Sequence, residues 1–326
     1  MILYFGLVIL GLSLYTLLFY LFLLWRLATA PNDKLHHRVF MQDLGDHSQL
    51  RQFSYYHILK ALRSIKLTMP AFQGVGCREE EFRSVLPILL HTESLIYVTD
   101  LDLEESLRKS EAYADPPLKK EIARFLGDYG LYDDKIAGAV EDLRRYAAYE
   151  SQIMLNQIEI TDERIRELCF RRGCDIYLML RILCRAKNLP YPEDYLYLEQ
   201  HLTALGEIQD DLSSYQKDVQ ENSVNVLRLC VRRHGTEKAL EKLRELATTI
   251  VDESIRVMKN VDKRHLANCA AAYFEIDWGI PFVLARPLFA CWPRFILVAF
   301  MKRYVMTVVM NTVFANAPRP IEEEEE

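Results

Sequence analysis

Residues 205–225, which read LGEIQDDLSSYQKDVQENSVN, contain the pattern on which the interpretation of the whole chain depends. Leucine and isoleucine recur there at helical spacing, so the stretch is predicted to form a helix. Asp210, Ser214 and Asp218 are four residues apart, and residues at that spacing stack on one helix face. Two carboxylates and a hydroxyl are hard oxygen ligands of the kind that Mg²⁺ takes, together with water and phosphate. The alternative is an acidic, solvated helix face without a ligand.

Residues 210–218 (DDLSSYQKD) resemble the second metal motif of class I terpene synthases. That motif runs from Asn or Asp, through an acidic residue, a Ser or Thr and a basic residue, to Glu. Here Asp stands at both ends, and each keeps an oxygen ligand. The resemblance implies that Asp210, Ser214 and Asp218 bind Mg²⁺ and that Lys217 meets a diphosphate. Residues 209–212 (QDDL) are also similar to the second aspartate motif of trans-prenyl diphosphate synthases, so the superfamily is better supported than the branch.

Composition predicts an all-α protein. The chain has 326 residues, 50% of them hydrophobic, with only 12 Gly and 12 Pro, and helical periodicity dominates. The net charge is −6 and no basic stripe dominates, which argues against nucleic acid as a main partner. The seven cysteines are scattered without zinc-ligand spacing, so buried, reduced thiols in a cytosolic compartment are expected.

The N-terminus is predicted to be a membrane anchor. Residues 2–25 carry no charge, and about 20 apolar residues suffice to span a bilayer. Arg26 and the cations that follow it predict that the rest of the chain lies on the cytoplasmic side of a single-pass protein. A cleaved signal peptide, ending near Ala28-Thr29-Ala30, is the competing interpretation. We expect an anchor at residues 1–30, a linker at 31–49, a helical domain at 50–315 and a disordered acidic tail at 316–326.

A second acidic pattern lies in the helix expected from Glu79 to about Lys109. Glu93, Tyr97, Asp100 and Glu104 are spaced by four, three and four residues, and so share one face. This region resembles the first aspartate-rich helix of isoprenoid synthases, although the doubled aspartate of that motif is missing. The resemblance implies that Asp100 and Glu104 are metal ligands on this side. A solvated acidic helix end is the alternative.

Arginines supply the expected diphosphate contacts. Residues 168–175 (LCFRRGCD) resemble the terpene-synthase helix that carries a diphosphate-sensing arginine. Arg172 fits the sensor, Asp175 fits the linking residue three positions later, and Gly173 fits the helix break. Arg303-Tyr304 resembles a late Arg-Tyr pair that the family places on diphosphate. The alternative for the arginines of this helix is a basic surface paired with nearby glutamates.

Helix boundaries can also be predicted. Asp133 and Asp134 are expected to cap a helix, and Thr161 carries an N-cap signature. From Leu266 to Ala315 the chain is apolar and aromatic but interrupted by three prolines. This segment is expected to form a pocket wall or to lie on a membrane surface.

Together, these resemblances imply a class I isoprenoid-synthase-like helical bundle with an N-terminal transmembrane helix. The implied enzyme is a membrane-anchored terpene synthase, a carbon–oxygen lyase that ionises a polyprenyl diphosphate with about three Mg²⁺ ions at most and releases diphosphate. A prenyltransferase or head-to-head condensing enzyme of the same fold is the first alternative. A non-catalytic, membrane-tethered helical scaffold is the second. The expected partners are the polyprenyl diphosphate and the membrane. The sequence is also compatible with a homodimer.

Overall fold

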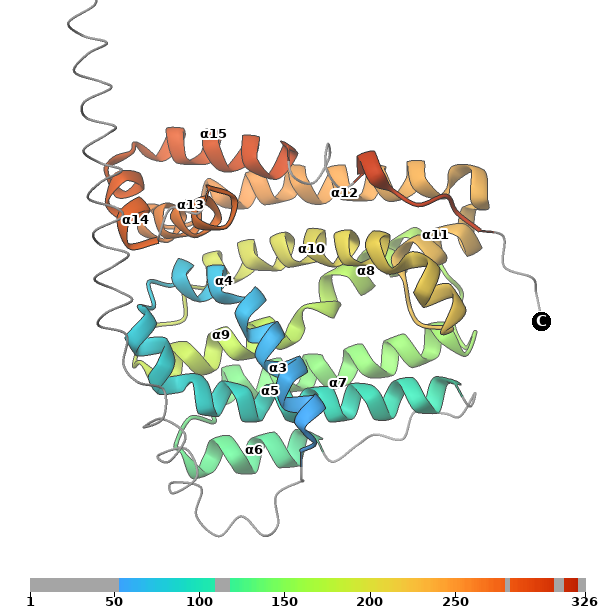
Figure 1. Cartoon of the computed structure of the whole chain (residues 1–326), viewed down its shortest axis with the longest axis horizontal. Coiled ribbons are helices and arrows are strands. Elements are labelled where there is room, and N and C mark those ends of the chain that lie inside the picture. Colours follow the sequence, from blue (N-terminus) through green and yellow to red (C-terminus); the bar gives the residue numbers. More distant parts are fainter. Residues whose placement is uncertain (1–52, 109–117, 279–281, 308–313, 322–326) are drawn as a thin grey trace, which may run out of the picture. The chain divides into compact units, whose positions relative to one another are not determined.

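The computed structural model describes residues 53–108, 118–278, 282–307 and 314–321, and within these ranges the secondary structure is helical throughout, without strands. The prediction of an all-α protein is therefore confirmed (Figure 1). In chain order the helices are α3 (Tyr55–Leu67), α4 (Met69–Gly74), α5 (Glu79–Arg108), α6 (Leu118–Asp128), α7 (Asp134–Met154), α8 (Asp162–Arg172), α9 (Cys174–Ala186), α10 (Glu193–Gln220), α11 (Val226–His234), α12 (Thr236–Met258), α13 (Lys263–Trp278), α14 (Phe282–Cys291), α15 (Arg294–Val305) and the 3₁₀ turn η2 (Phe314–Asn316).

Capping side chains fix several of these helix starts. The Asp133 carboxylate accepts a hydrogen bond from the Ile136 N–H (2.9 Å), and the Thr161 hydroxyl accepts one from the Arg164 N–H (3.3 Å). Both caps were predicted, and both are confirmed. Each satisfies an N–H group that the first helical turn leaves unpaired, a contribution of about 1 kcal/mol.

The central helix is shorter at its C-terminal end than the predicted stretch. Residues 205–220 are helical, but α10 ends at Gln220, and Asn222 adopts a left-handed conformation (φ +52°). Asn225 then caps α11, because its side-chain oxygen accepts hydrogen bonds from the Leu227 and Arg228 N–H groups. The prediction of a helix through residue 225 was wrong because Asn tolerates the left-handed turn and competes for backbone donors.

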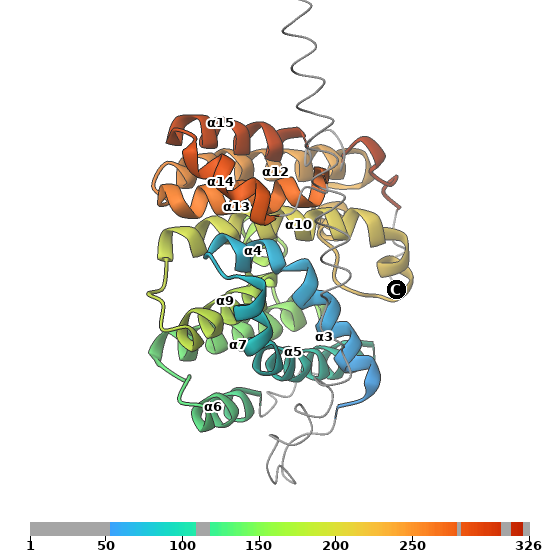
Figure 2. The same ribbon diagram turned by 60° about the vertical axis from the view of Figure 1, so that its left-hand side comes forward.

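Helix α10 lies between two groups of helices. In both ribbon views, α12, α13 and α15 lie on one side of it, and α5, α7 and α9 lie on the other (Figures 1 and 2). Its buried apolar side chains include Leu198, Leu205, Ile208 and Tyr215. Burying a side chain of this size contributes about 1.5–3 kcal/mol, so α10 anchors the core of the compact unit Arg51–Glu326.

Among the described residues, none of the helices combines the length and the apolar character needed to cross a membrane. The predicted anchor (1–30) and linker (31–49) lie outside the described residues, as do residues 322–326 of the acidic tail.

Candidate functional site

The predicted metal face of α10 is only partly assembled. The Ser214 hydroxyl donates a hydrogen bond to the Asp218 carboxylate, and the Asn225 side-chain amide donates to the same carboxylate oxygen at 2.8 Å. Asp210, one turn earlier, is exposed and lies close enough to Glu207 to raise the pKa of that acid. The structure therefore joins two of the three predicted ligands directly and leaves the third at the surface beside them.

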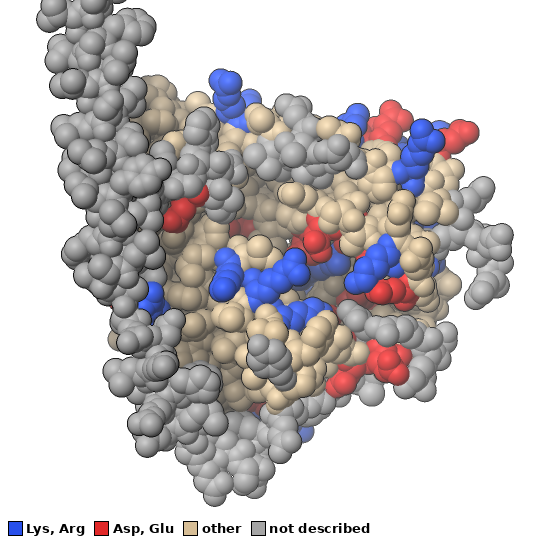
Figure 3. Space-filling view, in the orientation of Figure 1, with Lys and Arg blue, Asp and Glu red and all other residues tan. Residues whose placement is uncertain are grey.

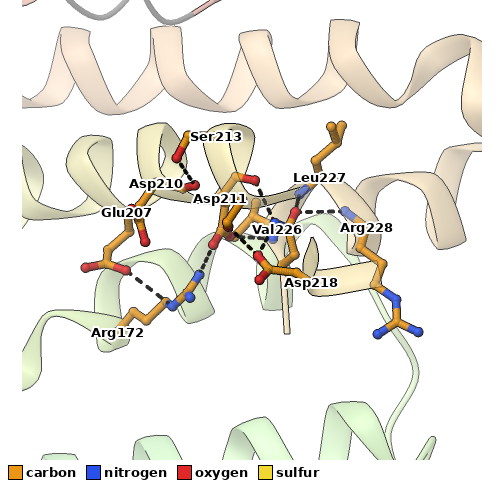
Figure 4. A network of polar contacts seen from close by, with 11 residues as sticks. Arg172, Glu207, Asp210, Asp211, Ser213, Asp218, Val226, Leu227 and Arg228 are labelled. Carbon is orange, nitrogen blue, oxygen red and sulfur yellow. Dashed lines mark hydrogen bonds and ion pairs between the residues drawn. The ribbon is translucent and has the colours of Figure 1, made fainter. Parts of the chain in front are cut away.

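Asp211 is a buried acid that the sequence analysis did not assign to the site. Its side chain is fully buried, with Arg172 on one carboxylate oxygen and the Val226 N–H at 2.6 Å on the other (Figure 4). Burial raises its pKa, and Arg172 and the Val226 N–H oppose that rise. The signal was available, because Asp211 falls between Ile208 and Tyr215 on the apolar stripe of the helix.

Arg172 ends α8 and reaches the acids of α10, as Figure 4 shows. It forms ion pairs with Asp211 and with Glu207, whose carboxylate oxygen lies 3.3 Å from Nε. Burial opposes its charge, but Asp211 and Glu207 outweigh this effect and raise the pKa of the guanidinium well above its usual value. Asp175 was predicted to link Arg172 to the helix break. Its carboxylate instead accepts a hydrogen bond from the Ile176 N–H at 2.8 Å.

Gly173 allows the α8–α9 junction to approach α10 closely. A Cβ atom at this position would lie 2.2 Å from Cγ2 of Thr203 on α10. No side chain fits into that space, so glycine is required where the chain turns from α8 into α9. The predicted helix break at Gly173 is confirmed, and it places Arg172 within reach of Asp211.

The acidic face of α5 meets the same group of side chains. Asp100 is half-buried, with an oxygen 3.7 Å from Nζ of Lys60. Burial raises its pKa, while Lys60 and then Arg172 lower it, which places the carboxylate within the electrostatic reach of Arg172. The side chain of Glu104, the other ligand expected here, is outside the described parts of the structure.

Glu93 is the second acid that sequence reasoning left out of the site, although it shares a face with Asp100. Its side chain is fully buried, and its carboxyl group lies close to the Ser64 hydroxyl and to the carboxyl group of Asp175. Burial raises its pKa well above the usual value, and Asp175 adds to the rise. Burial likewise raises the pKa of Asp175, to about 6. With a pKa of about 6, Asp175 is mostly ionised at pH 7, and its negative charge favours the protonated form of Glu93.

We call these side chains the polar centre; it is formed by Lys60, Glu93, Asp100, Arg172, Asp175, Glu207 and Asp211. Five of the seven are acids and two are cations, so the centre takes up protons or further cations. Its donors are hard oxygens, which are the kind that Mg²⁺ prefers. Within the described residues, however, no three His, Cys, Asp or Glu side chains are close enough together to hold one metal ion.

The remaining predicted residues lie further out. Lys217 is 71% exposed and lies 3.6 Å from a Glu221 oxygen, beside a hollow of about 480 Å³ that Ser214 also lines. Arg303 is exposed on α15, and Tyr304 packs against Tyr273 with ring centroids 5.1 Å apart. Arg303 and Tyr304 lie on α15, whereas Arg172 lies at the end of α8. Basic side chains gather over the middle of the face in Figure 3, and acidic ones lie in the hollow above them.

A second buried acid on α10, Glu199, forms no ion pair with any cation in the described ranges. The Tyr195 hydroxyl lies within hydrogen-bond distance of the Glu199 carboxyl and 3.1 Å from the Ala71 carbonyl oxygen. The Cys269 thiol is 3.9 Å away on α13. Burial raises the pKa of Glu199 to about 7, and Tyr195 and Cys269 oppose the rise. The protonated acid can donate to Tyr195, which then donates to Ala71.

No family model, curated protein or solved structure matches the chain.

Proposed function

We propose that the protein is a membrane-anchored class I terpene synthase, a lyase that ionises a polyprenyl diphosphate on the cytoplasmic side of the membrane. The observation that carries the proposal is the position of Arg172. It lies at a helix break between the acidic faces of α5 and α10, in the middle of an all-helical bundle. Helical bundles build metal and ligand sites from such facing acidic side chains.

In this proposal, oxygen ligands from both helices hold the metal. Asp210, Ser214 and Asp218 would bind Mg²⁺ from α10, and Asp100 and Glu104 would bind it from α5. When bound, Mg²⁺ neutralises charge on the diphosphate and makes it a better leaving group.

Arg172 would orient the diphosphate. Its Nε and Nη1 groups contact Glu207 and Asp211, which fix the plane of the guanidinium. Within the described part of the chain no partner is found for Nη2, so this group remains to donate to a phosphate oxygen. Lys217 would add a second positive charge. The allylic C–O bond then breaks, both electrons leave with the diphosphate, and the carbocation loses a proton to give an alkene or is captured by water.

The test uses the full chain in detergent with Mg²⁺ and prenyl diphosphates of increasing length, with organic extracts measured by mass spectrometry. The decisive variant is Asp210→Asn, because the exposed side chain can be changed without disturbing the core. Asp194→Asn, an exposed acid at the start of the same helix, is the matched control. We expect a hydrocarbon or alcohol product that Asp210→Asn loses and Asp194→Asn keeps. Products that join two substrates would indicate the prenyltransferase alternative.

A non-catalytic scaffold is the second candidate, and one observation favours it. Arg172 is already paired with two acids, and Asp211 also holds the backbone N–H at the start of α11, so these contacts form a closed structural network. A ligand that binds only the folded state raises its stability, by about 2.7 kcal/mol at 100 times the dissociation constant. Absence of turnover on every chain length, with no rise in melting temperature from Mg²⁺ and diphosphate, would establish the scaffold instead.

A further inference from the structure

Residues 278–321, which lie between Asp277 and the five C-terminal glutamates, form a basic segment in an acidic chain. Residues 278–321 contain five Lys or Arg residues and no Asp or Glu, whereas the full chain carries a net charge of −6. The five cations are Arg286, Arg294, Lys302, Arg303 and Arg319. Four of them lie on α14 and α15, so positive charge gathers on one pair of helices. On the face shown in Figure 3, the upper edge over α15 presents a basic side chain and no acidic one.

Large apolar side chains are exposed close to the point where these two helices meet. We call residues 287–296 the α14–α15 corner. Phe295 is 73% exposed, Leu288 is 54% exposed and Ile296 is 37% exposed. Single exposed apolar side chains are ordinary, but three within residues 288–296, on the two helices that carry the cations, form an amphipathic surface.

Aromatic side chains pack against the buried side of the corner. Phe289 is buried and packs against Phe274 at 5.4 Å, Trp292 at 4.7 Å and Phe300 at 5.1 Å between ring centroids. Aromatic pairs at these separations are stabilising beyond the area that they bury. The exposed side chains are therefore supported by a packed aromatic cluster. The aromatic residues of that cluster do not include the exposed Phe295.

Two acids near these helices, Asp262 and Glu275, have partners outside α14 and α15. On and beside α13, Asp262 accepts a hydrogen bond from the Arg264 N–H at 2.7 Å, and Glu275 accepts one from the Gln73 amide at 3.0 Å. Arg294 donates to the Val261 carbonyl oxygen. Among the described residues, no ion pair forms with the cations of α14 and α15. Their charge is thus available to an anionic partner.

We propose that the α14–α15 corner docks onto an anionic lipid bilayer, with Leu288 and Phe295 inserted among the headgroups and Lys302 and Arg303 close to lipid phosphates. Cations around apolar side chains are the combination that binds the bilayer surface. A nucleic acid would match the cations but leave Phe295 and Leu288 exposed to water. This inference does not depend on the proposed catalytic function. It requires only that the chain meets a membrane, as the apolar residues 2–25 predict.

An exposed cysteine in the corner allows a fluorescent label to be attached to this surface. Six of the seven cysteines are buried, and Cys291, within the corner, is exposed. A polarity-sensitive fluorophore on Cys291 of the full-length protein, reconstituted into vesicles, then reports whether the corner enters the lipid. Vesicles of phosphatidylcholine alone are compared with vesicles that also contain phosphatidylserine, so any anchoring by the N-terminus is the same in both. We expect a blue shift, and quenching by lipids labelled near the headgroup, only with phosphatidylserine.

Two variants and one matched control test the cause. Each basic residue near an anionic surface changes membrane affinity by roughly fivefold, so the Lys302→Glu, Arg303→Glu variant should lower the ratio of docked to undocked corner by roughly 25-fold or more. Phe295→Asp should also abolish the blue shift. Lys119→Glu, Lys120→Glu makes the same charge change on α6, at the opposite edge of the molecule in Figures 1 and 2, and should dock like the wild type. An unshifted Cys291 label on anionic vesicles, or equal loss in all three variants, would overturn the proposal.

Discussion

Helix α10 carries two fully or nearly fully buried acids, Asp211 and Glu199, about three turns apart, in different surroundings. Asp211 meets the cation of Arg172 and a backbone N–H. Among the residues that the structure describes, Glu199 meets a phenol hydroxyl and a thiol. Burying an ionised carboxylate is costly unless a charge or several donors compensate it. One helix therefore contains an acid held in an ion pair and an acid whose pKa of about 7 leaves it close to half protonated at neutral pH.

The largest expected effect comes from removing the cation at one of the two acids. Arg172→Met leaves the buried Asp211 and the half-buried Glu207 without their partner, and should lower the free energy of unfolding by about 3–5 kcal/mol, measured with urea at pH 7. Arg171→Met is the matched control, because Arg171 pairs with Glu167 at the surface and such pairs contribute about 1 kcal/mol or less. Equal losses in the two variants would show that Asp211 does not need the cation.

The second effect is a pH dependence that belongs to Glu199. Its pKa in the folded protein is about 7, above the ordinary value of 4.5, so the folded state binds the proton more tightly than the unfolded state. The stability associated with this acid is present below pH 4.5 and is lost as the pH rises through 7. Between pH 5 and pH 8 the wild type should lose about 2 kcal/mol that Glu199→Gln does not lose. Parallel pH profiles of the two proteins, from chemical denaturation, would contradict this assignment.

Next in size is the loss of the neutral donor. Tyr195→Phe removes the hydroxyl that lies between Glu199 and the Ala71 carbonyl oxygen and leaves buried acceptors unsatisfied, at a cost of about 1–2 kcal/mol. Tyr197→Phe, an exposed tyrosine of the same helix, should change stability by less than about 0.5 kcal/mol. Thermal unfolding of both variants measures the difference. If Tyr197→Phe costs as much, the hydroxyl of Tyr195 is not what stabilises Glu199.

The smallest expected effect on stability is at the exposed acid of α10. Asp210→Asn should change the free energy of unfolding by less than about 0.5 kcal/mol, because the side chain is at the surface. It should nevertheless abolish any stabilisation by Mg²⁺ with diphosphate, which differential scanning fluorimetry measures directly. Retention of that stabilisation would remove Asp210 from the metal site.

The sequence predicted the helices well because caps, helix breaks and apolar periodicity are local signals, as at Asp133, Thr161 and Gly173. It did not predict which acids of α10 lie inside. Spacing alone places Asp210, Ser214 and Asp218 on one face, but burial follows the apolar stripe that includes Asp211. The partners of Arg172 depend on how α8 crosses α10, which is a long-range property. Glu199 escaped notice because its neighbours Ala71 and Cys269 come from α4 and α13.

Two uncharged residues, Gly173 and Thr203, set the distance between α8 and α10, and therefore the distance between Arg172 and its acids. A methyl group added at Gly173 acts as a wedge against Thr203 and pushes α8 away from α10. Thr203→Ala removes the methyl group that lies 2.2 Å from the added carbon and leaves Cβ at 3.1 Å, which needs only a small shift. Thr203→Ala should therefore act as a second-site suppressor of Gly173→Ala. A pair of small residues would then set the strength of the buried ion pair, without any change to a charged group.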